Sequence, residues 1–231
     1  MKGFFVTGTD TGVGKTWMTA ALIHGLAEHG YRVAGIKPLA CGGHTTSEGW
    51  RHEDAELLMQ HASVTLPYEA VNPYLLREPV APHIAARQAG IRLSAAALHE
   101  ACTTLEEPLD CLLIEGVGGW EVPLNDEETT AHFARLLGLP VILVVGIRLG
   151  CLNHALLTGD AVARQKLTLA GWIANVIDPG MPKLKENIAA LEARLPAPRL
   201  GTVPHLPHFD AARIATALDF GKLLLRPRER P

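Results

Sequence analysis

The feature that most constrains this chain of 231 residues is a glycine-rich segment close to its start. An apolar run at residues 4–6 precedes the segment GTDTGVGKT at residues 8–16, and residues 17–28 have the pattern of a helix. A strand, a glycine-rich turn ending in Gly-Lys-Thr and a helix form a phosphate cradle, because glycines let backbone N–H groups converge on an anion. The helix N-terminus adds partial positive charge. The order of these parts predicts a phosphate-binding loop, in which Lys15 would reach the β- and γ-phosphates and Thr16 would bind Mg²⁺.

The loop departs from the strict spacing, in which a glycine is followed by four residues and then by Gly-Lys. Thr9 stands where that pattern has its first glycine. The partitioning ATPases carry a second lysine five positions before the main one, and that position is Asp10 here. The opposite charge argues against this subgroup. An ATPase switch of the partitioning type stays open as an alternative function, and a test for polymer or DNA binding would separate it from an enzyme.

Composition limits the remaining classes of protein. Apolar residues make up 48% of the chain, which is enough for a core, and the length suits one α/β domain over residues 1–231. The net charge is −3 with scattered Lys and Arg, so we expect no nucleic-acid surface. Apolar stretches are too short to span a membrane, and the first strand leaves no room for a signal peptide, so we expect a cytoplasmic protein. The short basic tail at residues 226–231 is expected to fray.

The cysteines and histidines do not form a metal or redox motif. The four cysteines contain no Cys-x-x-Cys pair, and Cys102 and Cys111 stand in apolar surroundings typical of a core. Reduced thiols suit the cytoplasm. His205 and His208 are three residues apart, but the prolines beside them argue against a regular helix and hence against a metal site.

Strand and helix patterns alternate along the chain. The continuous apolar run at residues 141–145 indicates a strand buried on both faces, as in parallel sheets. The alternation predicts an α/β fold with a single doubly wound, mainly parallel sheet and helices on both faces. Further strands are expected at residues 4–6, 33–36, 112–114, 169–176 and 200–203, and helices at 16–29, 53–61, 94–105, 129–137, 153–165 and 183–194. Residues 61–90 are proline-rich and are expected to be irregular, with a short helix near 83–88.

Polar residues stand where several predicted strands end. In doubly wound sheets the carboxyl ends of the strands form the binding crevice, and Lys15, Lys37, Glu115 and Asn175 all fall there. Glu115 ends an apolar strand and precedes a cluster of glycines, so it is placed to hold Mg²⁺ beside a phosphate loop. Two lysines at one rim suit a reaction in which negative charge moves between oxygens.

Several separated blocks of this sequence point to one family. They are GTDT-x-VGKT at residues 8–16, G-x-KP at 35–38, VNPY at 71–74 with Pro79 and Pro82-His83, EG-x-GGW-x-x-PL at 115–124, LPVILVV at 139–145, LGCLNH at 149–154 and LAGW-x-AN at 169–175. In order and spacing these blocks closely resemble the dethiobiotin synthetases, ATP-dependent ring-closing carboxylases of biotin synthesis. The resemblance covers residues 3 to about 206 and implies a P-loop NTPase-like fold.

The resemblance implies a reaction. The substrate would be 7,8-diaminononanoate. One of its amines would take up CO₂, which is in equilibrium with bicarbonate, to give a carbamate. ATP would phosphorylate the carbamate, and the second amine would close the ureido ring, releasing ADP and phosphate. Mg²⁺ would be the cofactor.

The resemblance also implies roles for individual residues. Lys37 and Lys15 would be catalytic, and Thr16, Asp54 and Glu115 would hold Mg²⁺. The nucleotide would contact Gly12, Val13, Gly14, Lys15, Thr16, Trp17, Asp54, Glu115, Gly116, Val117, Gly118, Asn175, Val176, Pro204, His205 and Leu206, with Asn175 reading the adenine. The substrate would contact Thr11, Lys37, Cys41, Gly118, Gly150, Cys151 and Asn153. The last three belong to a helix start that receives the distant carboxylate from a neighbouring subunit, so a homodimer is implied.

Two positions depart from the family pattern. Gly12 stands where an acidic residue is common, and Cys41 stands where a small hydroxyl residue is usual. A thiol is the weaker hydrogen-bond donor, so we expect a modest loss of substrate binding and no change of reaction. No paired histidine is evident that would make Cys41 a nucleophile. An amidotransferase-type ligase is a second alternative, but it needs a glutaminase domain for which we expect this chain to have no room.

Overall fold

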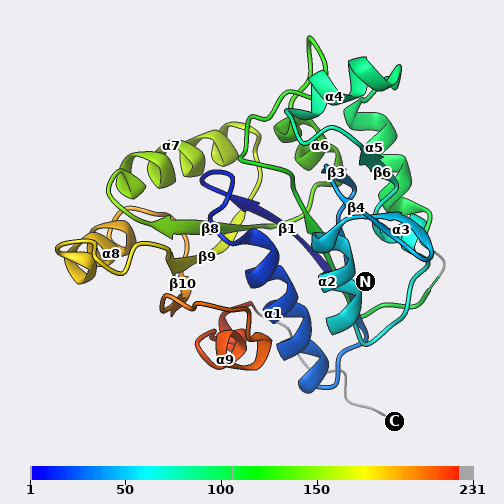
Figure 1. The fold of residues 1–231 in the computed structure, drawn as a ribbon. Helices are drawn as coiled ribbons and strands as arrows, with labels where there is room; N and C mark the ends of the chain where they lie inside the picture. Colours follow the sequence, from blue (N-terminus) through cyan, green and yellow to red (C-terminus); the bar gives the residue numbers. More distant parts are fainter. Residues whose placement is uncertain (1, 106, 224–231) are drawn as a thin grey trace.

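The computed structural model describes residues 2–105 and 107–223, and its centre is a parallel β-sheet (Figure 1). The sheet has six strands in the order β10-β9-β8-β1-β7-β2, and all of its neighbouring pairs are parallel. The chain enters at the central strand β1, builds one half through β2 and β7, and then builds the other half outward from β8. The predicted doubly wound sheet is confirmed. Its strands are β1 (Lys2–Gly8), β2 (Val33–Ile36), β7 (Cys111–Glu115), β8 (Val141–Ile147), β9 (Leu169–Val176) and β10 (Arg199–Val203).

Both faces of the sheet are buried, as the continuous apolar runs predicted. Successive residues of a strand point to opposite faces, and along β8 Leu143 joins one hydrophobic cluster while Ile142 and Val144 join the other. All seven residues of β8 are buried. A strand in this position has no solvent-facing side, which explains why its sequence shows no polar alternation.

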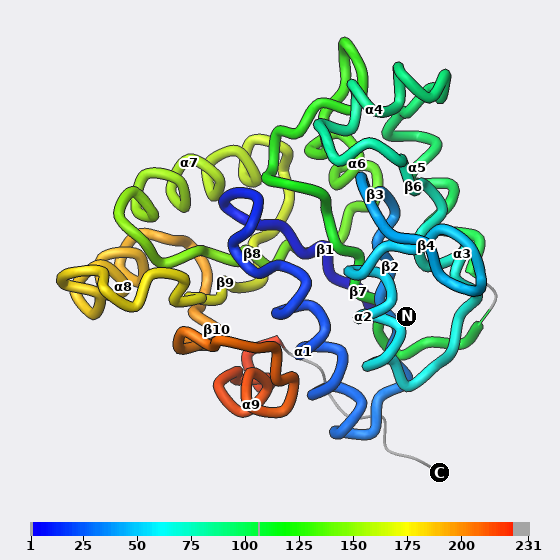
Figure 2. The backbone as a smooth tube through the Cα atoms, in the orientation of Figure 1, coloured from blue at the N-terminus to red at the C-terminus, as the bar shows by residue number. Residues whose placement is uncertain are grey.

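Helices cover the two faces of the sheet. One face is covered by α1 (Lys15–Glu28), which packs against α2 (Glu53–His61) and against α9 (Ala211–Thr216) near the end of the described chain (Figures 1 and 2). Buried side chains of four further long helices join the cluster on the opposite face. These helices are α5 (Ala95–Thr103), α6 (Thr130–Leu137), α7 (Cys151–Arg164) and α8 (Leu184–Glu192).

Several short elements were not predicted. Strand β3 (Leu39–Cys41) pairs in parallel with β6 (Tyr74–Leu76), and β4 (His44–Thr46) forms a hairpin with β5 (Gly49–Arg51). The stretch expected to be irregular contains α3 (Tyr68–Val71) and α4 (Pro82–Ala89), the second of which is the predicted short helix. Elements of three or four residues are too short to show a period in the sequence. A 3₁₀ turn, η1 (Phe220–Leu223), ends the described chain.

Two expectations concern the start of α7 and the chain terminus. Helix α7 begins at Cys151 and not at residue 153, because Gly150 caps it with a left-handed backbone at φ 94°. The tail at residues 226–231 lies outside the described residues. Within residues 2–105 and 107–223, no helix is both long and apolar enough to cross a membrane.

Candidate active site

The predicted strand, turn and helix are present at the phosphate loop. Strand β1 ends at Gly8 and α1 begins at Lys15. Gly12 and Gly14 between them have φ angles of 75° and 88°, in the left-handed region that favours glycine. A Cβ atom on Gly14 would also collide with the side-chain nitrogen of Asn175. The loop therefore keeps its glycines for both backbone conformation and close packing.

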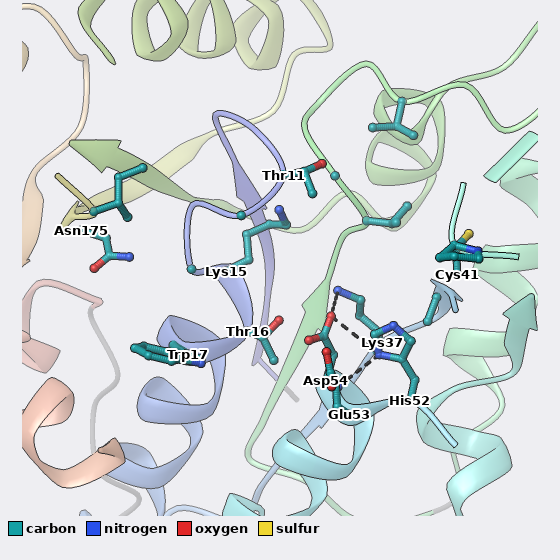
Figure 3. Close-up of a pocket in the computed structure, with 18 of the residues that line it drawn as sticks. Thr11, Lys15, Thr16, Trp17, Lys37, Cys41, His52, Glu53, Asp54 and Asn175 are labelled. Carbon is teal, nitrogen blue, oxygen red and sulfur yellow. Dashed lines mark hydrogen bonds and ion pairs between the residues drawn. The ribbon is translucent and has the colours of Figure 1, made fainter. Parts of the chain in front are cut away.

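A cavity of about 950 Å³ opens beside this loop, beyond the carboxyl ends of the strands (Figure 3). Doubly wound sheets bind ligands in this place. The structure brings most of the predicted site residues to its wall, from six separate segments of the chain. They are Thr11, Gly12, Gly14, Lys15, Thr16, Trp17, Lys37, Cys41, Asp54, Val117, Gly118, Asn175, Val176, Pro204, His205 and Leu206.

Lys37 lies at the centre of a buried charge network. It follows strand β2, and its side-chain Nζ lies 2.5 Å from Glu115 Oε1 and 2.8 Å from Asp54 Oδ2. Burial alone would lower the pKa of Lys37, but the two carboxylates outweigh it and raise that pKa well above its ordinary value. The charge of Lys37 in turn overcomes the effect of burial and lowers the pKa of Asp54. Lys37 is therefore a fixed ammonium group.

Two residues that sequence reasoning did not assign to the site hold Lys37 in place. The backbone carbonyl of Lys37 accepts a hydrogen bond of 2.6 Å from Asn72 Nδ2. The side-chain oxygen of Asn72, Oδ1, accepts a hydrogen bond of 3.0 Å from the Tyr68 hydroxyl. Tyr68 OH also accepts a bond from the backbone N–H of His52, just before α2. The sequence block VNPY, which contains Asn72, was the available signal for this role. It could not show which residue Asn72 contacts, because Lys37 lies 35 residues earlier in the chain.

The three predicted metal ligands converge on this network. The Thr16 hydroxyl donates to Glu115 Oε1 at 2.8 Å, and Glu115 and Asp54 share Lys37. Glu115 is fully buried, and its Oε2 has no hydrogen-bond partner among the described residues. Two carboxylates and a hydroxyl form an oxygen-only donor set that fits Mg²⁺. The part of the chain that the structure describes holds no cluster of three or more His, Cys, Asp or Glu side chains suited to a metal.

Lys15 lies at the mouth of the phosphate loop. Its Nζ donates to the backbone oxygen of Asp10 at 3.0 Å, and only 7% of the residue is exposed. Burial and the nearby charge of Lys37 lower the pKa of Lys15 to about 8. A second cation close by and a loop of N–H groups make this a place where an anion with several charges would be stabilised.

Some predicted residues do not reach the cavity wall. Val13 is buried beneath the loop, and its carbonyl accepts a 2.9 Å hydrogen bond from Asn175 Nδ2. Glu115 and Gly116 lie behind the wall, where both accept hydrogen bonds from Lys37. Asn175 therefore fixes the loop in addition to lining the cavity.

The segment from Gly150 to Asn153 lies apart from this cavity. Gly150 caps α7, Cys151 is buried, and Asn153 is exposed. The turn is tied to the phosphate loop by an ion pair of 2.7 Å between Arg148 and Asp10. Within one chain, then, these three predicted substrate contacts are not brought to the other site residues.

Cys41 lines the cavity near Lys37 (Figure 3). Burial raises the pKa of the Cys41 thiol to about 11, against a smaller opposing effect of Lys37. A thiol with this pKa stays protonated at neutral pH, so it is a poor nucleophile. The expectation that Cys41 serves as a contact fits this environment.

Sequence comparison finds a family match over most of the chain. Residues 2–213 match the family model of an AAA domain. The protein named ATP-dependent dethiobiotin synthetase BioD from Pseudomonas paraeruginosa is 50% identical over 224 residues, which cover 96% of this chain and 98% of that protein. The protein of the same name from a Janthinobacterium species is 49% identical over 95% of this chain and 94% of that protein.

Comparison with solved structures finds the same fold in distant proteins. The septum site-determining protein MinD from Pyrococcus horikoshii, complexed with Mg-ADP, matches with a TM-score of 0.56 and 17% identity over 95% of this chain and 88% of that one. A ParA family ATPase from Chlorobium tepidum matches with a TM-score of 0.58 and 11% identity over 97% of this chain and 99% of that one. At these identities the likeness shows the P-loop NTPase fold alone.

Proposed function

The chain belongs to the family of ATP-dependent dethiobiotin synthetases, which are ligases of biotin biosynthesis, and on this premise we propose that it carboxylates and closes 7,8-diaminononanoate. CO₂ is the carbon source, ATP the co-substrate and Mg²⁺ the cofactor. One amine takes up CO₂ to form a carbamate, ATP phosphorylates a carbamate oxygen, and the second amine displaces phosphate to close the ring. The products are dethiobiotin, ADP and phosphate.

The observation that carries this proposal is the juxtaposition of Lys37, Lys15 and the phosphate loop around one cavity. A kinase-like step needs cationic groups where charge develops on the transferring phosphoryl group and on the acceptor oxygen. Lys15 is placed by the loop, and Lys37 is placed by strand β2. The Lys37 ammonium, held by Asp54 and Glu115, would bring a fixed positive charge to the carbamate.

The nucleotide would occupy the phosphate loop with its base toward the far strand ends. The loop N–H groups and Lys15 would hold the phosphates, and the glycine-rich turn at residues 116–118 would approach them from β7. Asn175 and residues 203–206 line the same cavity on the side of β9 and β10. This arrangement supports the assignment of Asn175 and residues 204–206 to the nucleoside.

Thr16, Asp54 and Glu115 would hold Mg²⁺. The oxygen-only donor set and the buried Glu115 Oε2 without a partner among the described residues support this assignment. When bound, Mg²⁺ would neutralise charge on the β- and γ-phosphates. Lys37 would then share its carboxylate partners with the metal, and its ammonium would remain beside the acceptor.

We propose that the enzyme acts as a homodimer in the cytoplasm and that residues 1–231 form one functional domain. The diamine's carboxylate lies at the far end of an aliphatic chain and needs an anion site away from Lys37. The start of α7 at Gly150–Asn153 presents the positive end of a helix dipole, which suits a carboxylate, and its place outside the cavity wall supports a contribution from the neighbouring subunit. The four free cysteines fit a reducing compartment.

The test is the release of ADP from the purified protein with ATP and Mg²⁺. Release should require both bicarbonate and 7,8-diaminononanoate, and the product should have the mass of dethiobiotin. ADP release that needs neither compound would refute the synthetase assignment. Stimulation by DNA or by polymer formation would instead favour an ATPase switch.

A further inference from the structure

We propose that Trp17 is the stacking platform for the nucleobase, an inference that rests on the proposed use of ATP. Trp17 follows Lys15 and Thr16 in the first turn of α1, so it is the first large side chain after the phosphate loop. It lines the same cavity as Asn175 and Leu206. This role differs from the backbone contacts that the phosphate loop makes with the phosphates, because here the indole ring of Trp17 contacts the base.

The position of Trp17 in the cavity sets which part of the nucleotide it meets. Figure 3 shows Trp17 and Asn175 at one end of the cavity and Lys37 and Cys41 at the other, with Lys15 between them. The acceptor of the phosphoryl group must lie at the Lys37 end. A nucleotide whose phosphates are held at Lys15 therefore extends its ribose and base toward Trp17.

The indole ring packs against a second aromatic ring. The ring centroid of Phe209 lies 5.7 Å from that of Trp17 at an interplanar angle of 56°, and it lies 5.4 Å from the ring centroid of His61 in a T-shaped arrangement. Helix α9, which follows Phe209, packs against α1. A ring held in this way loses little rotamer freedom when a ligand stacks on it, so more of the stacking energy appears as affinity.

Asn175, the polar residue at this end of the cavity, already makes a hydrogen bond within the protein. Asn175 uses its amide nitrogen to hold the carbonyl of Val13 at 2.9 Å. Its capacity to read the edge of a base is correspondingly reduced, whereas stacking on an aromatic ring uses the face that every base presents. We therefore assign most of the base-binding energy to Trp17.

Calorimetric titration of the full-length protein with Mg-ADP, without diamine or bicarbonate, tests this assignment. Replacing Trp17→Ala should weaken ADP binding by roughly 5- to 150-fold, the range expected for losing one base–aromatic stack. GDP binding should weaken by a similar factor, because stacking is indifferent to the base edge. Trp17→Phe keeps a smaller platform and should stay within about threefold of the wild type.

Tryptophan fluorescence gives a second readout that a merely structural role would not move. ADP should change the emission of the wild type and of the control Trp50→Phe, whose residue does not line the cavity. The same change should be missing in Trp17→Phe, a variant that stays informative even if Trp17→Ala fails to fold. Wild-type ADP affinity in a folded Trp17→Ala protein, or a loss confined to ADP, would overturn the proposal.

The design separates this proposal from the synthetase assignment. Nucleotide binding is measured without the other substrates, so a Trp17-dependent ADP site in a protein that makes no dethiobiotin would refute only the proposed function. Synthesis of dethiobiotin with ADP binding independent of Trp17 would refute only the stacking role. In an active enzyme, Trp17→Ala should raise the KM for ATP and leave the KM for the diamine unchanged.

Discussion

Removing the charge of Lys37 should destabilise the fold as well as slow the reaction. Lys37→Met keeps most of the side-chain volume and deletes the ammonium that lies 2.5 Å from Glu115 and 2.8 Å from Asp54. Glu115 is fully buried, so its charge would lose its cationic partner without gaining water. Breaking a buried pair in this way costs about 3–5 kcal/mol. For a chain of this size, at about 2–4 °C per kcal/mol, Tm should fall by roughly 6–20 °C.

Thermal and denaturant unfolding of a short series would measure this effect. The double variant Lys37→Met/Glu115→Gln removes the orphaned charge and should recover much of the lost stability. Acidification should narrow the gap between Lys37→Met and the wild type, because protonation of the carboxylates removes their unpaired charge. Lys183→Met is the matched control, since its pair with Glu186 is exposed and worth about 0–1 kcal/mol.

The same variant tests catalysis. The Lys37 ammonium should act mainly in the transition state, so Lys37→Met should lower kcat by roughly 100-fold or more while ADP still binds. A Tm within about 2 °C of the wild type at neutral pH, with no recovery in the double variant, would refute the buried-charge argument. Near-normal turnover would refute the catalytic role.

Three further predictions concern metal, pH and the dimer. EDTA should abolish synthesis and Mg²⁺ restore it, because the ligand set contains only oxygen; full activity in metal-free buffer would contradict the site. Since burial and Lys37 lower the pKa of Lys15 to about 8, the free protein loses this cation above that pH. The affinity for ADP, measured by calorimetry, should therefore be constant below pH 8 and should decrease above it, by up to about tenfold per pH unit. The Lys15→Met variant should not show this decrease, and a wild-type affinity that stays constant above pH 8 would contradict the prediction. A bulky Gly150→Leu change should raise the KM for the diamine and leave the KM for ATP unchanged. Mixing Gly150→Leu chains with Lys37→Met chains should restore part of the activity, because a heterodimer contains one intact site. A verified heterodimer without activity would show that the carboxylate is bound within one chain.

The large elements of the fold could be predicted because they are long enough to show a pattern. Strand β9 and helix α2 coincide with the residue ranges expected from sequence, and the six strands of the sheet were all expected. The buried run in β8 correctly indicated a parallel sheet. Strands β3 to β6 have three residues each, and their pairing depends on partners distant in sequence, which no local pattern reports.

Residue types at the site could be predicted, but their pairing could not. Sequence reasoning put Lys37 on the same rim as Lys15 and assigned it no carboxylate partner. The structure instead buries it between Asp54 and Glu115 and fixes its carbonyl through Asn72. A lysine before a proline reads as a surface residue until its carboxylate partners, one of them 78 positions away, are known.

The register of the parallel sheet explains how separate blocks of sequence become one site. Ile36 pairs with Ile114 in β2 and β7, so the next residues, Lys37 and Glu115, come side by side at the carboxyl ends of these strands. Strand β1 lies between β7 and β8, so the phosphate loop emerges next to Glu115 and reaches Asn175 on β9, whose side chain then holds Val13. A shift of β2 by one residue would turn Lys37 to the other face of the sheet and leave Glu115 buried without a cation. The chemistry of the site therefore depends on apolar strand residues such as Ile36 and Ile114, which do not line the cavity and yet determine which charges meet.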